Sequence, residues 1–496
     1  MIVDILRPLL DGLVCSTGGF RMVAAVATTA LVGSVAARVI YSTFFCPLRH
    51  IPGPFLVRIS DMFLYWPRSN GKIHEVLERM HRQYGPVVYY GPGKVSVADV
   101  QAIKPILERY PKARRYAALA RVLGREDLFT VIDPDKHHHL RRIFSPAFSL
   151  AYLNSLEQYI HLRIKSMLNH IRAACNHPDE DAVVDMWGLL QRLALDVIGE
   201  TSFGESFYTI ENGSHPLPQS VRTVMKKTAI CALVPGISCL VNIKPELQYT
   251  EEFMNARIRT RRECVEEKRK DLLQFLLDAR DNKQNNLDDI DVLRQAVIFL
   301  IAGSDSTAIT MFNTLLFLIK HPETLQRLRL ELNEAVCNVK EEVPPHEILK
   351  NLDFLNAVLK ETMRLRPIVV AGVAREAPED VEILGYAIPK GTSVIANLSW
   401  VQTDPKVWGA DTLEFRPERF LEEYPKDAFY PFSAGTRNCI GQNFAMIELR
   451  SAVAALLLHF DIELPAEEQS EELVGYITLG LKSNRYKMRL RPRSRL

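Results

Sequence analysis

The sequence predicts a mainly α protein with a small β region and an N-terminal helix that crosses a membrane. Three stretches carry this prediction. One is a long apolar run from Met22 to Phe45, and another is a helical pattern that starts near Asp288 and reaches the proline at 322. The last is a loop with two glycines and a cysteine, 432–441, followed by a helical pattern over 442–460. Together they favour one large helical domain behind an N-terminal anchor.

The overall composition is that of a globular protein with a large core. Of the 496 residues, 47% are hydrophobic and 24% are charged, and the formal net charge is +2. This balance gives no support for a nucleic-acid partner. The eight cysteines form no Cys-x-x-Cys pair, which argues against a disulfide framework or a zinc site and indicates a reducing compartment. Because no glycine-rich phosphate-binding motif occurs, electrons for any redox chemistry must come from another protein.

Residues 1–45 are predicted to contain a retained membrane anchor. The apolar run is close to the roughly 20 residues that a helix needs to span a bilayer. Its one charge, Arg38, lies near one end, where the side chain can reach the interface. A cleaved signal peptide is the alternative, but the run is long and no convincing small-residue cleavage site follows it. Residues 46–56 contain three prolines and a glycine, which predict a stiff hinge.

The next part of the chain alternates helical patterns with a hairpin and loops. We expect helices over 74–84, 154–174, 183–200 and 217–233, a hairpin over 87–98, a loop-rich region over 101–130, and strands over 381–388 and 392–398. Three consecutive histidines, His137 to His139, invite a metal-site interpretation. Neighbours on a helix point about 100° apart, however, so they cannot converge on one ion.

The central helical pattern is long enough to cross a whole domain, since 1.5 Å per residue gives roughly 48 Å. It contains Ala302-Gly303-Ser304-Asp305-Ser306-Thr307. A glycine in the middle of a helix costs about 1 kcal/mol relative to alanine, so it usually has a packing or functional reason. The serine and threonine hydroxyls either face a ligand or bond back to the preceding turn.

The loop Phe432-Ser433-Ala434-Gly435-Thr436-Arg437-Asn438-Cys439-Ile440-Gly441 presents one sulfur ahead of a helix. Gly435 can adopt a backbone conformation closed to other residues, and Gly441 leaves room for close approach of a flat ligand. Unpaired amide groups and the helix dipole favour a thiolate at Cys439, and Arg437 adds positive charge. A buried, inert cysteine is the alternative.

The spacing Phe-x-x-Gly-x-Arg-x-Cys-x-Gly closely resembles that of the cytochrome P-450 family. The resemblance implies a haem b cofactor, iron-protoporphyrin IX, with Cys439 as the axial ligand of the iron. In that family the thiolate pushes electron density onto the metal and favours O–O cleavage. By position, Arg437 is then a partner of a haem propionate, Phe432 packs near the sulfur, and Gly441 lies against the haem.

Two further motifs follow the family order. The segment 302–307 resembles the oxygen-binding helix, Ala-Gly-x-Asp-Thr-Thr, with Ser306 in place of the first threonine. The resemblance implies that Ser306 hydrogen-bonds dioxygen and that Asp305 passes protons inward, with Thr307 beside them in the catalytic set. Glu361 and Arg364 share a helix face, and with Arg419 of Pro-Glu-Arg-Phe they resemble the family's structural triad behind the cysteine loop.

Other positions match the family pattern less closely. The segment 137–141 resembles the Trp-x-x-x-Arg helix, with His137 in place of tryptophan. The resemblance makes Arg141 and Arg375 candidate propionate ligands. Arg142 is either a charge that faces the reductase or part of a solvated basic face. Gln402 stands where the family often has histidine.

The resemblance covers nearly the whole chain and implies a cytochrome P-450 fold over 57–496, with a long central helix over the haem. The implied function is monooxygenation of a small lipophilic substrate by a haem-thiolate enzyme, with O2 and with electrons from NADPH that a NADPH-cytochrome reductase delivers. The anchor and hinge look most like those of fungal microsomal members in secondary metabolism, which implies the endoplasmic reticulum membrane and a cytosolic catalytic domain. The alternatives are a haem-thiolate isomerase or dehydratase that needs no external electrons, and a non-catalytic haem binder.

Overall fold

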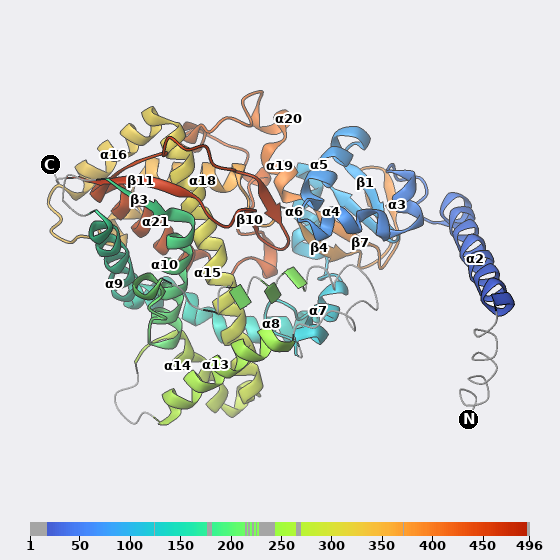
Figure 1. Ribbon diagram of the computed structural model, residues 1–496, viewed down its shortest axis with the longest axis horizontal. Helices are drawn as coiled ribbons and strands as arrows, with labels where there is room; N and C mark the ends of the chain where they lie inside the picture. The colour runs from blue at the N-terminus through green and yellow to red at the C-terminus, as the bar shows by residue number, and fades with distance from the viewer. Residues whose placement is uncertain are drawn as a thin grey trace.

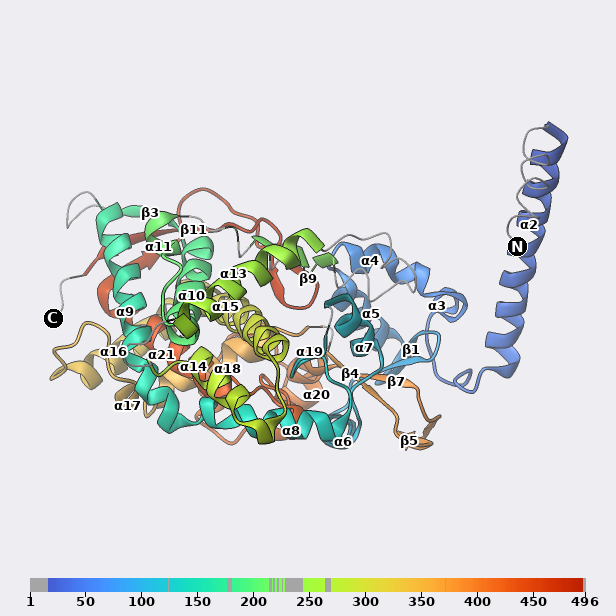
Figure 2. The same ribbon diagram turned by 90° about the horizontal axis from the view of Figure 1, so that it is seen from below.

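The computed structural model describes residues 17–123, 125–175, 181–213, 244–263, 269–370 and 372–493, together with residues 216, 219, 220, 223, 224, 226 and 227. A large helical body holds most of the chain. A smaller β region lies beside it, and the N-terminal helix projects away from both (Figures 1 and 2). A mainly helical protein with a small β region is therefore confirmed.

The helices are α2 (Thr17–Ile40), α3 (Phe55–Ile59), α4 (Tyr65–Ser69), α5 (Ile73–Tyr84), α6 (Val100–Arg109), α7 (Arg115–Leu123), α8 (Pro134–Phe144), α9 (Leu150–Ala174), α10 (Met186–Phe203), α11 (Thr209–Asn212), α13 (Lys244–Glu263), α14 (Leu272–Asp281), α15 (Asp289–Lys320), α16 (Pro322–Val336), α17 (His346–Leu349), α18 (Asp353–Leu365), α19 (Leu398–Thr403), α20 (Pro405–Trp408) and α21 (Gln442–His459). Short 3₁₀ turns and a π-helical turn at Tyr41–Phe45 connect some of them.

The strands are β1 (Val87–Gly91), β2 (Lys94–Val97), β3 (Ala182–Asp185), β4 (Val373–Glu376), β5 (Val381–Ile383), β6 (Tyr386–Ile388), β7 (Ser393–Ala396), β8 (Phe460–Glu463), β9 (Leu473–Gly475), β10 (Leu479–Leu481) and β11 (Lys487–Pro492). The largest sheet has the order β1-β2-β7-β4, with β2 and β7 parallel and the other pairs antiparallel. A second sheet has the order β3-β11-β8, and β5–β6 and β9–β10 are two separate hairpins.

Helix α15 is the centre of the helical body. It begins with a capping box between Asp288 and Asp291 and ends at His321, just before Pro322. It packs against α10, α13, α14, α18 and α21, and its inward residues belong to the larger hydrophobic core. Although α15 is apolar enough to cross a membrane, most of its apolar window is buried inside the protein. Its hydrophobicity therefore serves the core.

The N-terminal helix is apolar and solvent-exposed. The stretch Ala24–Phe45 is long and apolar enough to span a membrane, and no residue of its apolar 18-residue window is buried inside the protein. It leads into a second hydrophobic core that packs α5 and α6 around the four-stranded sheet. The predicted apolar helix is present; its insertion in a membrane stays a prediction.

Several local expectations were wrong. The region 101–130 contains α6 and α7, because Asp99 caps α6 with hydrogen bonds to two backbone amides. The pattern over 183–200 begins with strand β3 before Asp185 caps α10. The run 381–388 is a hairpin, turning through Leu384 and Gly385 at φ values of 52° and 80°. The helix expected over 217–233 lies largely outside the described residues.

Candidate active site

The loop before α21 has the backbone that its glycines predict. Gly435 has a φ of +71°, and Ser433 has a φ of 61°. A Cβ atom on Gly435 would lie 2.9 Å from the Cα atom of Glu108 in α6, so this position excludes a side chain both by conformation and by space. The Cys439 amide donates to the Phe432 carbonyl at 2.9 Å and closes the loop. Cys439 is therefore presented from a tightly specified turn.

Arg141, on α8, holds the residue before the cysteine. Its guanidinium donates to the backbone oxygen of Asn438 at 2.6 Å and to Asn438 Oδ1 at 2.7 Å. Arg437 turns the other way, toward the carbonyls of Val131 and Ile132. The expectation that Arg437 supplies the positive charge near the sulfur was wrong, because its side chain points into the loop before α8. Arg141 supplies that charge.

The Cys439 thiol is surrounded by protein, yet its side chain keeps accessible surface. Burial raises its pKa, while the Gly441 backbone amide and Arg141 act in the opposite direction. The side chain nevertheless retains accessible surface. Both observations hold if the sulfur faces an internal space rather than the outside of the protein. A sulfur in such a place is suited to ligate a metal that a flat cofactor brings to it.

Gly441 lies beside the Cys439 sulfur. A Cβ atom built there would meet only the Cys439 sulfur and the Phe148 ring, each at 4.0 Å. The Phe148 ring in turn packs edge-on against Phe299 of α15, with 5.2 Å between the ring centroids. This chain of contacts connects the cysteine loop to α15. Three residues farther along α15, Ala302 is exposed in the middle of a core helix, as expected for a residue that lines the same space.

The hydroxyl groups of the α15 motif bond back to their own helix. Ser306 Oγ donates to the Ala302 carbonyl at 2.7 Å, and Thr307 Oγ1 donates to the Gly303 carbonyl at 2.6 Å. The oxygen of each hydroxyl can still accept a hydrogen bond. The reason for the glycine is packing, because a Cβ atom on Gly303 would lie 2.6 Å from Ile198 Cδ1 of α10. Asp305 accepts a hydrogen bond from Thr478, which the sequence did not predict.

A buried group of cations lies beside the loop. Arg375 of β4 is 2% exposed and Lys112 is 8% exposed. Burial and then Arg375 lower the pKa of Arg437 to about 10. Burial and then Arg437 lower the pKa of Lys112 well below its usual value, and the same two causes lower that of His137 to about 3. These groups repel one another, so the cluster favours an anionic ligand.

The cation group fits the two carboxylates of a haem. The Nε atom of Arg375 is buried and makes no hydrogen bond to any residue that the structure describes. Lys112 is the member that sequence reasoning missed, and no motif could have marked it. Arg437 and Arg375 are brought together here, whereas Arg141 is engaged with Asn438.

The three triad residues meet behind the loop. Arg364 donates to both oxygens of Glu361, at 2.7 and 2.8 Å, and Arg419 Nε donates to Glu361 Oε1 at 3.0 Å. Gln402 completes the group. Its side-chain amide donates to the Met363 and Arg364 carbonyls, and its backbone carbonyl accepts a hydrogen bond from the Arg364 guanidinium. The glutamine at the family's histidine position thus links α18 to α19 by buried hydrogen bonds.

Glu448 of α21 is a second residue that the motifs did not mark. It is completely buried, and burial raises the pKa of its carboxyl well above the usual value, with Thr307 acting slightly in the other direction. Neither oxygen makes a hydrogen bond within the described part of the chain. Burial therefore disfavours the charged form of this carboxyl group, which lies next to the α15 motif.

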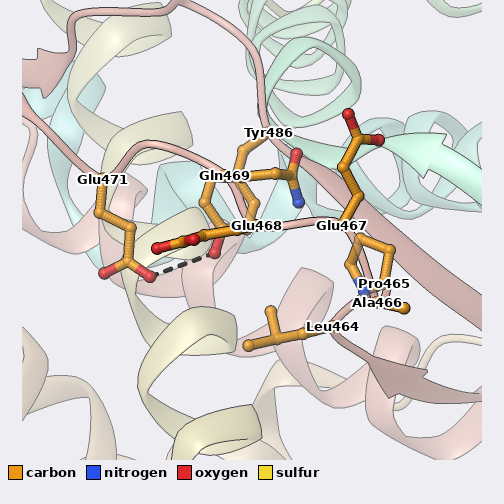
Figure 3. A pocket seen from close by; sticks show the side chains of 8 residues that line it. All are labelled: Leu464, Pro465, Ala466, Glu467, Glu468, Gln469, Glu471 and Tyr486. Carbon is orange, nitrogen blue, oxygen red and sulfur yellow. Dashed lines mark hydrogen bonds between the residues drawn. The ribbon is translucent and has the colours of Figure 1, made fainter.

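A surface pocket of about 340 Å³ lies elsewhere in the molecule (Figure 3). It is lined by residues 464–469, Glu471 and Tyr486. One of its three glutamates, Glu471, is already engaged by the Tyr486 hydroxyl and by Lys320. None of the expected site residues lines it, and we assign it no role in the chemistry.

Comparisons with known proteins agree with the geometry. The profile of the family described as Cytochrome P450 matches residues 52–490. Cytochrome P450 monooxygenase FUS8 of Gibberella fujikuroi is 32% identical over 468 residues, covering 90% of this chain and 89% of the relative. Cytochrome P450 monooxygenase acrD of Aspergillus aculeatus is 32% identical over 90% of this chain and 91% of the relative. Pisatin demethylase of Fusarium vanettenii is 29% identical, over 86% of this chain and 87% of the relative.

Proposed function

The chain belongs to the cytochrome P450 family and is a haem-dependent monooxygenase, and we propose that Cys439 is the thiolate ligand of its haem iron. The observation that carries this proposal is the position of the Cys439 sulfur, which keeps accessible surface although burial raises its pKa. The position of Gly441 beside this sulfur, with no atom closer than 4.0 Å to an added Cβ, supports it. The buried Arg375 and Lys112 and the half-buried Arg437 are suited to hold the two propionates.

When bound, the haem supplies the redox chemistry by which one atom of dioxygen enters the substrate and the other leaves as water, with two electrons from NADPH by way of a reductase. The protein's own residues orient and protect this chemistry. Arg141 and Phe432 fix the loop through Asn438 and the Cys439 amide. Ser306 offers a hydroxyl oxygen that can accept a hydrogen bond, and Asp305 places a carboxylate on the same helix that can relay protons.

The substrate is a small lipophilic molecule of secondary metabolism. The support comes from relatives in fungi, two of which carry the name cytochrome P450 monooxygenase and a third the name pisatin demethylase. Exposed Ala302, with Phe299 one helical turn before it, gives the site an apolar wall on α15.

The enzyme is proposed to reside on the endoplasmic reticulum membrane, with residues 1–45 as anchor, 46–56 as hinge and 57–496 as a catalytic domain that faces the cytosol. Helix α2 supports this arrangement, because its apolar window has no residue buried inside the protein. A redox partner would then approach from the same membrane.

The test is the absorption spectrum of membranes that contain the protein, reduced and treated with carbon monoxide. Wild type should give the strongly red-shifted Soret band of thiolate ligation, and Cys439→His should lose the band while still binding haem. A well-folded, haem-loaded wild type without the band would refute the assignment. A requirement for NADPH in turnover separates the monooxygenase from an isomerase or dehydratase.

A further inference from the structure

Thr478 lies at the tip of the β9–β10 hairpin and contacts the α15 motif. Its Oγ1 donates to Asp305 Oδ2 at 2.5 Å, across 173 residues of chain, and both residues are half-buried. A hydroxyl that donates to a carboxylate forms a charge-assisted hydrogen bond, which is stronger than one between neutral groups. The orientation of the Asp305 side chain is therefore coupled to the hairpin.

The hairpin is itself attached to the body on both sides of Thr478. The Gly475 amide donates to the Gly71 carbonyl at 2.8 Å, and the Leu479 amide donates to the Ile368 carbonyl at 2.9 Å. A Cβ atom on Gly475 would lie 2.8 Å from Val370 Cγ2, so the backbone packs closely here. The backbone on both sides of Thr478 is thus held in place by hydrogen bonds to the body of the protein.

The hydroxyls of α15 near Asp305 are committed elsewhere. Ser304 donates to the Leu300 carbonyl at 2.9 Å, and Ser306 and Thr307 donate to the Ala302 and Gly303 carbonyls. A hydroxyl has one hydrogen to donate. Among the residues that the structure describes, Thr478 is the one whose side chain is seen to donate to the Asp305 carboxylate.

We propose that Thr478 is a positioning residue for Asp305, which rests on the monooxygenase function proposed above. The Thr478 hydroxyl holds the carboxylate in one rotamer, so that proton transfer through Asp305 starts from a fixed place. The Asp305 carboxylate takes up a proton from solvent and passes it toward the oxygen-binding side, so it is a carboxylate again after each transfer. Without the hydroxyl, the carboxylate is free to adopt other rotamers.

The test compares Thr478→Val with Thr478→Ser. Valine keeps the shape and the β-branched stiffness of threonine but has no hydroxyl, whereas serine keeps the hydroxyl. Purified proteins are reconstituted with a fungal reductase and NADPH without added substrate. Dioxygen is then reduced either to hydrogen peroxide, with one NADPH, or to water, with two. Haem content and the carbon monoxide spectrum of each variant are measured first.

We expect Thr478→Val to keep its haem and its spectrum while the share of dioxygen reduced to water falls to about half or less, because proton delivery limits that branch. The rate of NADPH oxidation should also become more sensitive to replacement of H2O by D2O. Thr478→Ser should return both quantities to wild type. If the hairpin had only a structural role, Thr478→Val would alter the haem content or the carbon monoxide spectrum. Recovery of both kinetic quantities in Thr478→Ser, with unchanged spectra in both variants, would not be expected.

A double-mutant cycle shows whether Thr478 acts through Asp305. Adding Thr478→Val to Asp305→Asn should change nothing further, because the positioned group is already gone. Wild-type behaviour of Thr478→Val in both measures, failure of serine to rescue, or full additivity in the cycle would overturn the proposal. A haem-loaded wild type that lacks the red-shifted carbon monoxide band would instead refute the proposed thiolate site, which is a distinguishable result.

Discussion

Arg419 and Glu361 are 58 residues apart in the chain, yet Arg419 Nε lies 3.0 Å from Glu361 Oε1 in the interior of the protein. The same carboxylate accepts two further hydrogen bonds from Arg364. One buried carboxylate therefore binds two buried guanidinium groups, and Asp411 is a second carboxylate partner of Arg419. The three-residue segment Pro417–Arg419 is fixed against α18.

Replacing Glu361 should abolish haem incorporation rather than slow turnover. Glu361→Gln removes the carboxylate partner of the buried Arg364 and leaves Arg419 with Asp411 as its carboxylate partner, at a cost of about 3–5 kcal/mol. The measurement is haem bound per mole of purified protein. Glu418→Gln is the matched control from the same segment, since Glu418 is a partly exposed partner of Arg327 and such pairs contribute less than about 1 kcal/mol. A Glu361→Gln protein with full haem content would contradict the expectation.

Removing the Ser306 hydroxyl should uncouple electron use from product formation. Ser306→Ala keeps the helix, because alanine is the best helix former, but it removes the oxygen that can accept a hydrogen bond. We expect unchanged haem binding and more peroxide per NADPH consumed. Ser306→Thr should match or improve on the wild type, since the extra methyl group restricts χ1.

The control for this experiment is Ser304→Ala. Ser304 lies on the same helix and bonds back to the Leu300 carbonyl in the same manner. Peroxide release by Ser304→Ala should equal that of wild type. Equal release from all three proteins would remove Ser306 from the catalytic set.

Acid should destabilise the β region through His81. Burial lowers the pKa of His81 to about 4, with Nδ1 bonded to the Gly85 carbonyl and Nε2 to the Ser96 hydroxyl. Because the folded value is below the unfolded value of about 6.5, the stabilisation is complete above pH 6.5 and is lost as the pH falls toward 4. The loss amounts to roughly 3 kcal/mol at one pKa unit per 1.36 kcal/mol.

The measurement is the midpoint of thermal unfolding between pH 4 and pH 7.5. His81→Gln should show a smaller drop over this range than wild type. His138→Gln, at an exposed position of α8, should follow the wild-type curve. Parallel curves for wild type and His81→Gln would show that His81 is not the titrating group.

Deleting residues 1–45 should release the protein from membranes. Helix α2 has no buried contact with the body over its apolar window, so the remaining chain keeps both hydrophobic cores. We expect a haem-loaded protein with an unchanged carbon monoxide spectrum in the soluble fraction. Retention in the membrane pellet after a high-salt wash would mean that other apolar residues, such as the exposed Met62 and Trp66, also hold the protein there.

A side chain at Gly435 should disrupt the cysteine loop. Gly435→Ala imposes strain at a φ of +71° and places a Cβ atom 2.9 Å from the Glu108 backbone, so haem content should fall sharply. Gly385→Ala is the matched control, because its φ is +80° but nothing lies within 4 Å of the added atom. It should cost only about 1 kcal/mol of backbone strain and keep its haem. Equal haem contents in the two variants would show that the contact with α6 is unimportant.

The parts of the site that were predictable from sequence are the local ones. The turn at Gly435, the helix α15 with its motif and the pairing of Glu361 with Arg364 all depend on residues within a few positions of one another. The direction of Arg437 was not predictable, because its partners, Val131 and Ile132, lie in a distant loop.

Long-range contacts account for most of what the sequence did not show. The hydrogen bonds of Arg141 to Asn438 and of Thr478 to Asp305 join segments that no spacing relates. The burial of Glu448 was not predictable from the sequence for another reason. A glutamate in a helical pattern is usually exposed, and its burial follows only from the packing of α21 on α15.

The parallel pairing of β2 with β7 has a consequence for synthesis of the protein. Lys94–Val97 pairs with Ser393–Ala396, so the sheet near the N-terminus cannot be completed until most of the chain has left the ribosome. Until β7 has been synthesised, the edge of β2 in the β1–β2 hairpin has no partner strand. Cys439 is synthesised later still. Haem can therefore be enclosed only at the end of translation, and the nascent chain depends on protection from aggregation until then.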